Sequence, residues 1–375
     1  MSYARARLWL GICGVGTVVV LCVLTLAFRL PALLPRTDTQ PLWRDAVALT
    51  AVLFAYAALQ GAFDFFGGHI LPTEYGRTRV RFGTFLAGWL RGVVAHSLIL
   101  LSVGLALIVA ARAGGFWGTS GAFLLISLVL LAAQTIFAGL VGGIRCRRGG
   151  NSGMSEATAV TLAGSDSAYF TGGIAGVPGF ETLVVPARWQ KVFSPEEWAL
   201  ILRRRSGSLT TGARNRGLAL ALGFNTIGFA LACALSGGTA SVAGLVSTSL
   251  WFTLWSFVGL LVLPTPSQQG VFATDAFARA RGEDTATLSE VIRKLDRDQD
   301  DEPARPDGVE RIFHPLPSVE RRLARLSAPE TAAAPGAWHA ARMAIYLSWA
   351  GMSFLSRAVH CNAGRPDAWV FLPSD

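Results

Sequence analysis

Long uncharged runs of apolar residues alternate with short arginine-bearing segments at the start of the chain. Each run holds 18 to 21 residues, which is the length of helix that crosses the hydrocarbon core of a bilayer. The runs that predict transmembrane helices are Leu8–Phe28, Ala46–Phe63, Gly92–Ala111 and Ala122–Val141. The first run has no small-x-small cleavage site, so it predicts a signal-anchor helix rather than a removed signal peptide. Residues 1–144 are therefore expected to form four transmembrane helices.

The next segment, residues 145–213, is rich in glycine, serine and threonine. Short strands are expected at Ser167–Gly173 and Glu181–Val185, with a glycine turn between them. A helix then begins after Ser194, because proline suits the first helical position and Glu197 completes a Ser-x-x-Glu capping box. This segment is expected to lie outside the membrane.

The second half of the chain repeats the alternation of apolar and polar segments. No charged residue occurs from 217 to 270, and glycines interrupt the run near residue 237, so residues 214–263 predict a transmembrane hairpin with spans at 217–235 and 241–263. Residues 264–330 are polar, with a helical apolar stripe at 288–295. In the tail, residues 331–375, only 14 consecutive uncharged residues occur after Arg342, which favours an interfacial or packed helix.

Composition places the chain in a membrane. Hydrophobic residues make up 52% and charged residues 15%, and the mean hydropathy is +0.45, which excludes an ordinary soluble protein. The net charge of +9 comes from arginines that flank apolar runs, which argues for orientation in a lipid bilayer and against nucleic-acid binding. Their placement predicts a bacterial cytoplasmic membrane with the polar domain in the cytoplasm. The five cysteines are scattered, without the spacing of a disulfide framework or a zinc site.

Four features then follow one another in a fixed order: a Thr-Gly-Gly segment at 171–173, the Ser-Pro-Glu-Glu helix, the hairpin, and a polar segment with Ala-Thr-Asp-Ala at 273–276 and His-Pro at 314–315. This order resembles the integral-membrane zinc metallopeptidases of the HtpX and CAAX prenyl endopeptidase type. The resemblance covers about residues 160 to 330. It implies a multi-pass α-helical membrane protein with a cytoplasmic α+β, gluzincin-like peptidase domain.

The zinc chemistry of that family does not carry over to this chain. The positions that match the two histidines of the His-Glu-x-x-His helix hold Arg204 and Ser208, and the position of the general base holds Arg205. Val271 stands where the family has its third ligand, a glutamate, while Asp275 matches an aspartate beside the site. An arginine cannot lose its proton to become a ligand, so neither a metal nor another cofactor is expected.

The sequence therefore predicts a pseudoprotease that binds a polypeptide or a membrane protein without hydrolysis. The residues expected to contribute to binding are Tyr169, Phe170 and Thr171 as an edge strand, the arginines Arg203, Arg204 and Arg205, and His96. The arginines are also explained as solvated side chains beside the bilayer.

Two alternative functions stay open at this point. In the first, the chain is a transport or lipid-handling protein in which His96 and Gln134 face one cavity, because ionisable residues inside a membrane are often functional. In the second, it is a still-active metalloendopeptidase with an atypical site. Asp64, His69 and Glu74 suit a metal by type, but their spacing predicts a solvated interfacial loop.

Overall fold

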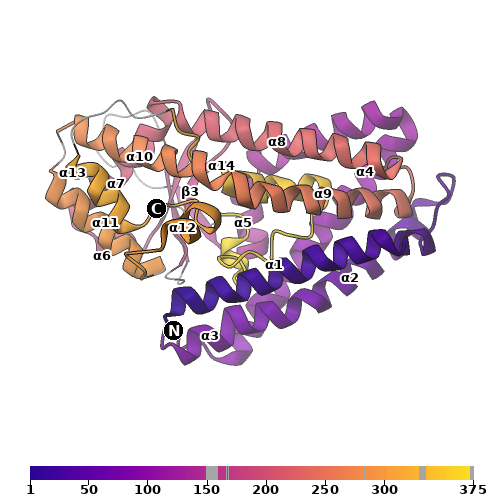
Figure 1. The fold of residues 1–375 in the computed structure, drawn as a ribbon, viewed down its shortest axis with the longest axis horizontal. Coiled ribbons are helices and arrows are strands. Elements are labelled where there is room, and N and C mark those ends of the chain that lie inside the picture. The colour runs from indigo at the N-terminus through magenta and orange to yellow at the C-terminus, as the bar shows by residue number, and fades with distance from the viewer. Residues whose placement is uncertain are drawn as a thin grey trace.

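The computed structural model describes residues 1–148, 159–165, 167, 169–282, 284–299, 301–328 and 335–371. Five helices lie side by side along the length of the molecule and form a helical bundle (Figure 1). They are α1 (Tyr3–Ala27), α2 (Leu42–Phe65), α4 (Phe82–Ala132), α8 (Ala213–Ser236) and α9 (Val242–Val262). These helices, with α2 continued to Glu74, are long and apolar enough to cross a membrane, and large apolar side chains such as those of Phe54 and Leu125 are exposed on them. The protein is an integral membrane protein.

One end of the bundle carries a polar domain, which consists of the described parts of residues 145–213 and 264–330 (left in Figure 1). Its helices are α6 (Trp189–Val192), α7 (Pro195–Thr210), α10 (Pro264–Ala280), α11 (Thr285–Gln299), α12 (Asp307–Phe313) and α13 (Val319–Ser327). Its strands are β1 (Arg145–Arg148), β2 (Ala159–Gly164), β3 (Gly173–Ala175) and β4 (Thr182–Pro186). Short elements complete the chain: η1 (Leu30–Leu33), η2 (Phe66–Ile70), α3 (Leu71–Glu74), α5 (Gln134–Gly142), α14 (Ala340–Leu347), η3 (Ser348–Gly351) and η4 (Pro366–Ala368).

Helix α4 joins the third and fourth predicted spans. Its 51 residues would extend about 77 Å as a straight helix, more than twice the ~30 Å of bilayer hydrocarbon. The helix is broken at Gly114 and Gly115, whose backbone angles are not helical, and the φ of Gly115 is +55°. A Cβ on Gly118 would lie 2.3 Å from the carbonyl oxygen of Ala110, so the chain folds back tightly across the break. The break separates the two predicted spans although the chain stays helical on either side.

The sheet has the order β1-β2-β4-β3, with a parallel central pair and antiparallel edges. Strand β4 confirms the strand expected at Glu181–Val185. The prediction of a strand at Ser167–Gly173 is wrong. Tyr169 lies in a turn and β3 begins only at Gly173, while Asp166 and Ala168 lie outside the described residues. Gly172 has a φ of +72°, and a Cβ there would lie 2.0 Å from the carbonyl oxygen of Val184, so the chain turns at this glycine before pairing with β4.

The C-terminal segment, residues 335–371, runs through the interior of the bundle (yellow in Figure 1). Of its 37 residues 30 are buried, and its one α-helix, α14, has only eight residues. The segment reaches α8 and α10 through glycines: a Cβ on Gly217 would lie 2.0 Å from the carbonyl oxygen of Trp338, and a Cβ on Gly270 would lie 2.4 Å from its Cα. The tail is thus a packed core element in which non-helical residues outnumber helical ones.

An ion pair between Asp64 of α2 and Arg357 attaches the C-terminal segment to the bundle. Both side chains are fully buried, and Asp64 also accepts hydrogen bonds from Nε1 of Trp89 at 3.0 Å and from the backbone N–H of Gly364 at 2.8 Å. The guanidinium of Arg357 stacks 4.7 Å from the ring of Trp369. The expectation that Asp64 lies in a solvated loop is therefore wrong, because α2 continues through it and buries its carboxylate.

We expect Asp64→Ala to lower the free energy of unfolding by about 3–5 kcal/mol, because Arg357 would remain buried without its counter-charge. Chemical unfolding in detergent micelles measures the loss. Arg293→Gln is the matched control, since Arg293 pairs with Glu290 on the surface and should change stability by less than about 1 kcal/mol. Equal effects of the two substitutions would contradict the structural role of the buried pair.

Candidate functional site

Helix α7 carries Arg204, Arg205 and Ser208, which the sequence resemblance aligns with metallopeptidase residues. The start of this helix is fixed by the predicted capping box. The backbone N–H of Glu197 donates to Oγ of Ser194 at 3.3 Å, and the backbone N–H of Ser194 donates to the Glu197 carboxylate at 2.9 Å. Lys294 of α11 donates to the other carboxylate oxygen at 2.5 Å. The cap sets where the helix begins and therefore which residues face the interior of the polar domain.

Arg204 lies buried on α7 and forms an ion pair with Asp275 of α10, with 2.8 Å between Nε and the carboxylate. Arg322 of α13 approaches the same carboxylate with two nitrogens, at 2.8 and 2.9 Å. These three side chains, here called the Arg–Asp–Arg triad, are each no more than 3% exposed. The triad joins α7, α10 and α13 at the place where the family resemblance expects a metal.

The charges of the triad determine the protonation of its carboxyl group. Burial by itself raises the pKa of Asp275, but the positive charges of Arg204 and Arg322 and their hydrogen bonds outweigh it. The pKa of Asp275 therefore lies below its ordinary value, and the carboxylate is ionised at neutral pH. The two guanidinium groups supply the positive charge that stabilises it.

Arg205, at the position of the general base, points to the sheet. It donates to the carbonyl oxygen of Val184 in β4 at 2.7 Å and to that of Thr171, just before β3, at 2.6 Å. Its guanidinium lies 5.2 Å from the ring centre of Trp189. Arg205 is 1% exposed, so it connects the helix to the sheet and leaves no group at this position that could accept a proton from water.

The remaining ligand positions are equally unsuited to zinc. The hydroxyl of Ser208 donates to the carbonyl oxygen of Arg205 at 2.7 Å, and Val271 packs in an apolar cluster with Leu202 and Trp338. Zinc needs nitrogen, sulfur or carboxylate ligands, and two guanidinium groups nearby would repel the ion. Within the described ranges no group of three or more His, Cys, Asp or Glu residues could hold a metal ion. These residues do not fit the zinc that the sequence resemblance implies.

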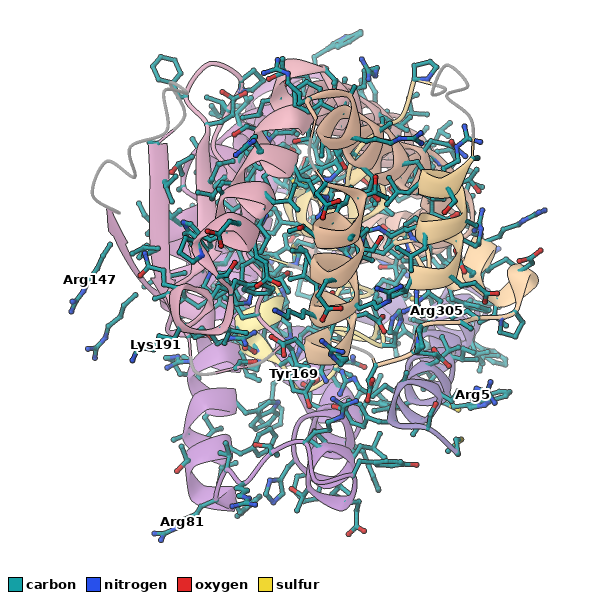
Figure 2. The ribbon with its side chains drawn as sticks, turned by 90° about the vertical axis from the view of Figure 1, so that its left-hand side faces the viewer. Arg5, Arg81, Arg147, Tyr169, Lys191 and Arg305 are labelled. Carbon is teal, nitrogen blue, oxygen red and sulfur yellow. The ribbon has the colours of Figure 1, made fainter. Side chains whose placement is uncertain are left out.

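The other residues expected to bind a partner do not gather at this site. Phe170 and Thr171 are buried beside the sheet, and Arg203 is half-buried on α7. His96 is fully buried between the rings of two tryptophans of the C-terminal region, 4.5 and 5.5 Å from their centres. Gln134 instead lines a small cavity next to β3. Tyr169 lies at the junction of the polar domain and the bundle (Figure 2).

Sequence reasoning missed Arg322, although a signal for it was present. The His-Pro segment at 314–315 leads into α13, and Ser318 caps that helix, with the backbone N–H of Arg321 donating to its Oγ at 3.5 Å. Arg322 then lies one turn into α13, directed at Asp275. Gln268 of α10 donates to the carbonyl oxygen of His314 at 2.7 Å. The motif thus holds α12 and α13 against α10.

The triad predicts a specific dependence of stability on pH. Because the pKa of Asp275 is lower in the folded protein, its contribution is fully present above the unfolded value of about 3.9 and is lost as the pH falls through the folded value. We expect Asp275→Asn to lower the free energy of unfolding by about 3–5 kcal/mol at pH 7 and to flatten its decrease below pH ~4. Unfolding measured from pH 7 to 3 tests this.

The control for this experiment is Asp301→Asn, which removes an exposed partner of Arg77 and should change the pH profile little. If Asp275→Asn kept the full acid sensitivity of the unsubstituted chain, Asp275 would not be the group that titrates.

Comparison with known proteins identifies a similar fold. No protein-family model and no curated protein matches the sequence. The structure is similar to the crystal structure of S. mikatae Ste24p, with a TM-score of 0.65 and 10% sequence identity over 77% of this chain and 76% of that chain. At this identity the likeness shows the fold alone. The chain has a Ste24p-like fold.

Proposed function

We propose that this chain is a membrane-embedded pseudoprotease that binds a polypeptide without zinc-dependent hydrolysis. The observation that carries the proposal is the Arg–Asp–Arg triad, which puts a guanidinium at the first ligand position and satisfies it with Asp275. Removing either charge would leave the other buried without its partner, so the arrangement is built to be stable without a metal. The lipid bilayer surrounds the helical bundle.

Support for polypeptide binding comes from the edge of the sheet. Strand β3 is an edge strand, and such strands bind extended peptides by adding a further strand. The edge strand expected at Tyr169–Thr171 is wrong by a few residues, since these lead into β3. A cavity of about 30 Å³ beside β3 is lined by Ile174 of that strand and by Trp338 and Phe371 of the C-terminal segment. A bound polypeptide would have to displace or extend this segment.

The proposal predicts that the purified chain contains no stoichiometric zinc and hydrolyses no membrane or unfolded protein substrate. Elemental analysis after exposure to zinc and a fluorogenic peptidase assay test the two statements. Arg204→Gln with Arg205→Gln is the matched variant, because it removes both guanidinium groups and adds no zinc ligand. Zinc at one ion per chain, or hydrolysis that survives in this variant, would contradict the proposal.

Polypeptide binding is tested separately by photo-crosslinking in native membranes. A crosslinking amino acid in place of Ile174 should capture a second polypeptide, since this residue lies on β3 next to the cavity. The same replacement at Phe180, which is 83% exposed and outside the sheet, is the control. Crosslinks only within the chain from position 174, or equal capture from both positions, would argue against binding at this edge.

A further inference from the structure

A second cavity of about 60 Å³ lies where the polar domain meets the bundle and the C-terminal segment. It is bordered by α9, by the end of α12, by α14 and by the last turns of the chain. Its charged and polar lining includes Tyr169, Arg305, His314, Arg342, His360 and Arg365, and no described lining residue is acidic. Figure 2 places Tyr169 inside this junction, whereas Arg147 points away from the molecule.

Arg365 is the residue whose contacts call for a further partner. It is 6% exposed, it donates to the hydroxyl of Tyr3 at 2.6 Å, and its guanidinium lies 3.5 Å from the ring centre of Tyr169. Its Nε has no hydrogen-bond partner among the described residues. A buried guanidinium normally bonds to a carboxylate or a phosphate, and within the described part of the chain no carboxylate forms an ion pair with this one.

Arg7 of α1 adds a second positive charge beside the first. It is 2% exposed and donates to the backbone carbonyl oxygens of Gly67, His360 and Ala363, the last at 3.2 Å. None of these acceptors carries a negative charge. Arg7 therefore bonds to the turn that directly precedes Arg365, and two buried positive charges on this turn are costly unless an anion accompanies them.

We propose that this cavity binds an oxyanion of the phosphate type, with Arg365 as its main ligand. Its volume is well above the ~10–15 Å³ that a single water molecule needs, which leaves room for a small oxyanion. Planar guanidinium groups match phosphate oxygens in pairs, and basic pockets at the ends of transmembrane helices bind phospholipid headgroups. The cavity lies at such an end, because Arg365, which lines it, donates to the hydroxyl of Tyr3 in the first turn of α1 at 2.6 Å.

The anion has two possible sources, a phospholipid headgroup or free phosphate, and the binding chemistry is the same for both. The proposal does not depend on the absence of peptidase activity, because the cavity is lined by none of the triad residues. The two proposals can therefore fail separately.

The test uses the full chain, purified in detergent and, in parallel, reconstituted in nanodiscs of phosphatidylcholine and phosphatidylglycerol. Equilibrium dialysis with radiolabelled inorganic phosphate measures the free anion, and native mass spectrometry of protein released from the nanodiscs counts retained phospholipid. We expect one phosphate-bearing molecule per chain. Arg365→Gln should lower its association constant about tenfold or more, because a charge-assisted hydrogen-bond pair is lost. Arg147→Gln removes an exposed charge of β1 and should change the association constant by less than about twofold.

Each outcome has a defined reading. If the chain retains a phospholipid and this lipid prevents phosphate from binding, the headgroup is the natural ligand. If phosphate binds and no lipid is retained, the free anion is the natural ligand. Binding of neither by the unsubstituted chain, or equal binding by Arg365→Gln and Arg147→Gln, would overturn the proposal. If Arg365→Gln does not fold, Arg365→Lys keeps the charge but loses the paired geometry, and unchanged affinity in that variant would count against Arg365 as the ligand.

Discussion

Buried guanidinium groups set the main constraint on this structure. An arginine stays charged in any protein environment, so each one in the interior must be matched by an acceptor. Asp275 matches Arg204 and Arg322, and Asp64 matches Arg357. Because the partners lie on different elements, the polar domain is held together across α7, α10 and α13, and the C-terminal segment is held inside the bundle. Much of the tertiary arrangement follows from these pairings.

The C-terminal segment changes what the bundle is able to do. It fills the interior with aromatic and apolar side chains, and its backbone approaches α8 and α10 so closely that only glycine fits at positions 217 and 270. It also lies beside β3, the edge of the sheet that a bound polypeptide would extend. The C-terminal segment therefore affects both the accessibility of β3 and the packing of the bundle. A change in the packing of this segment is expected to change the accessibility of β3.

A Ste24p-like fold is present here at 10% sequence identity. Fold and catalysis depend on different side chains. Helix packing and sheet pairing require only side chains of suitable volume and polarity, with glycine where two backbones come close. At the Arg–Asp–Arg triad, guanidinium and carboxylate groups hold α7, α10 and α13 together.

The sequence alone determined the features with local causes: the apolar runs, the cap at Ser194, and the side-chain types at Arg204, Ser208 and Val271. These depend on hydropathy, hydrogen bonding within one turn, and side-chain type. Only the tertiary structure decided that Arg322 completes the triad, that Asp64 is buried, and that the tail lies inside the bundle. Each of these joins residues far apart in the chain, and neither periodicity nor composition carries information about which distant charge will neutralise a buried one.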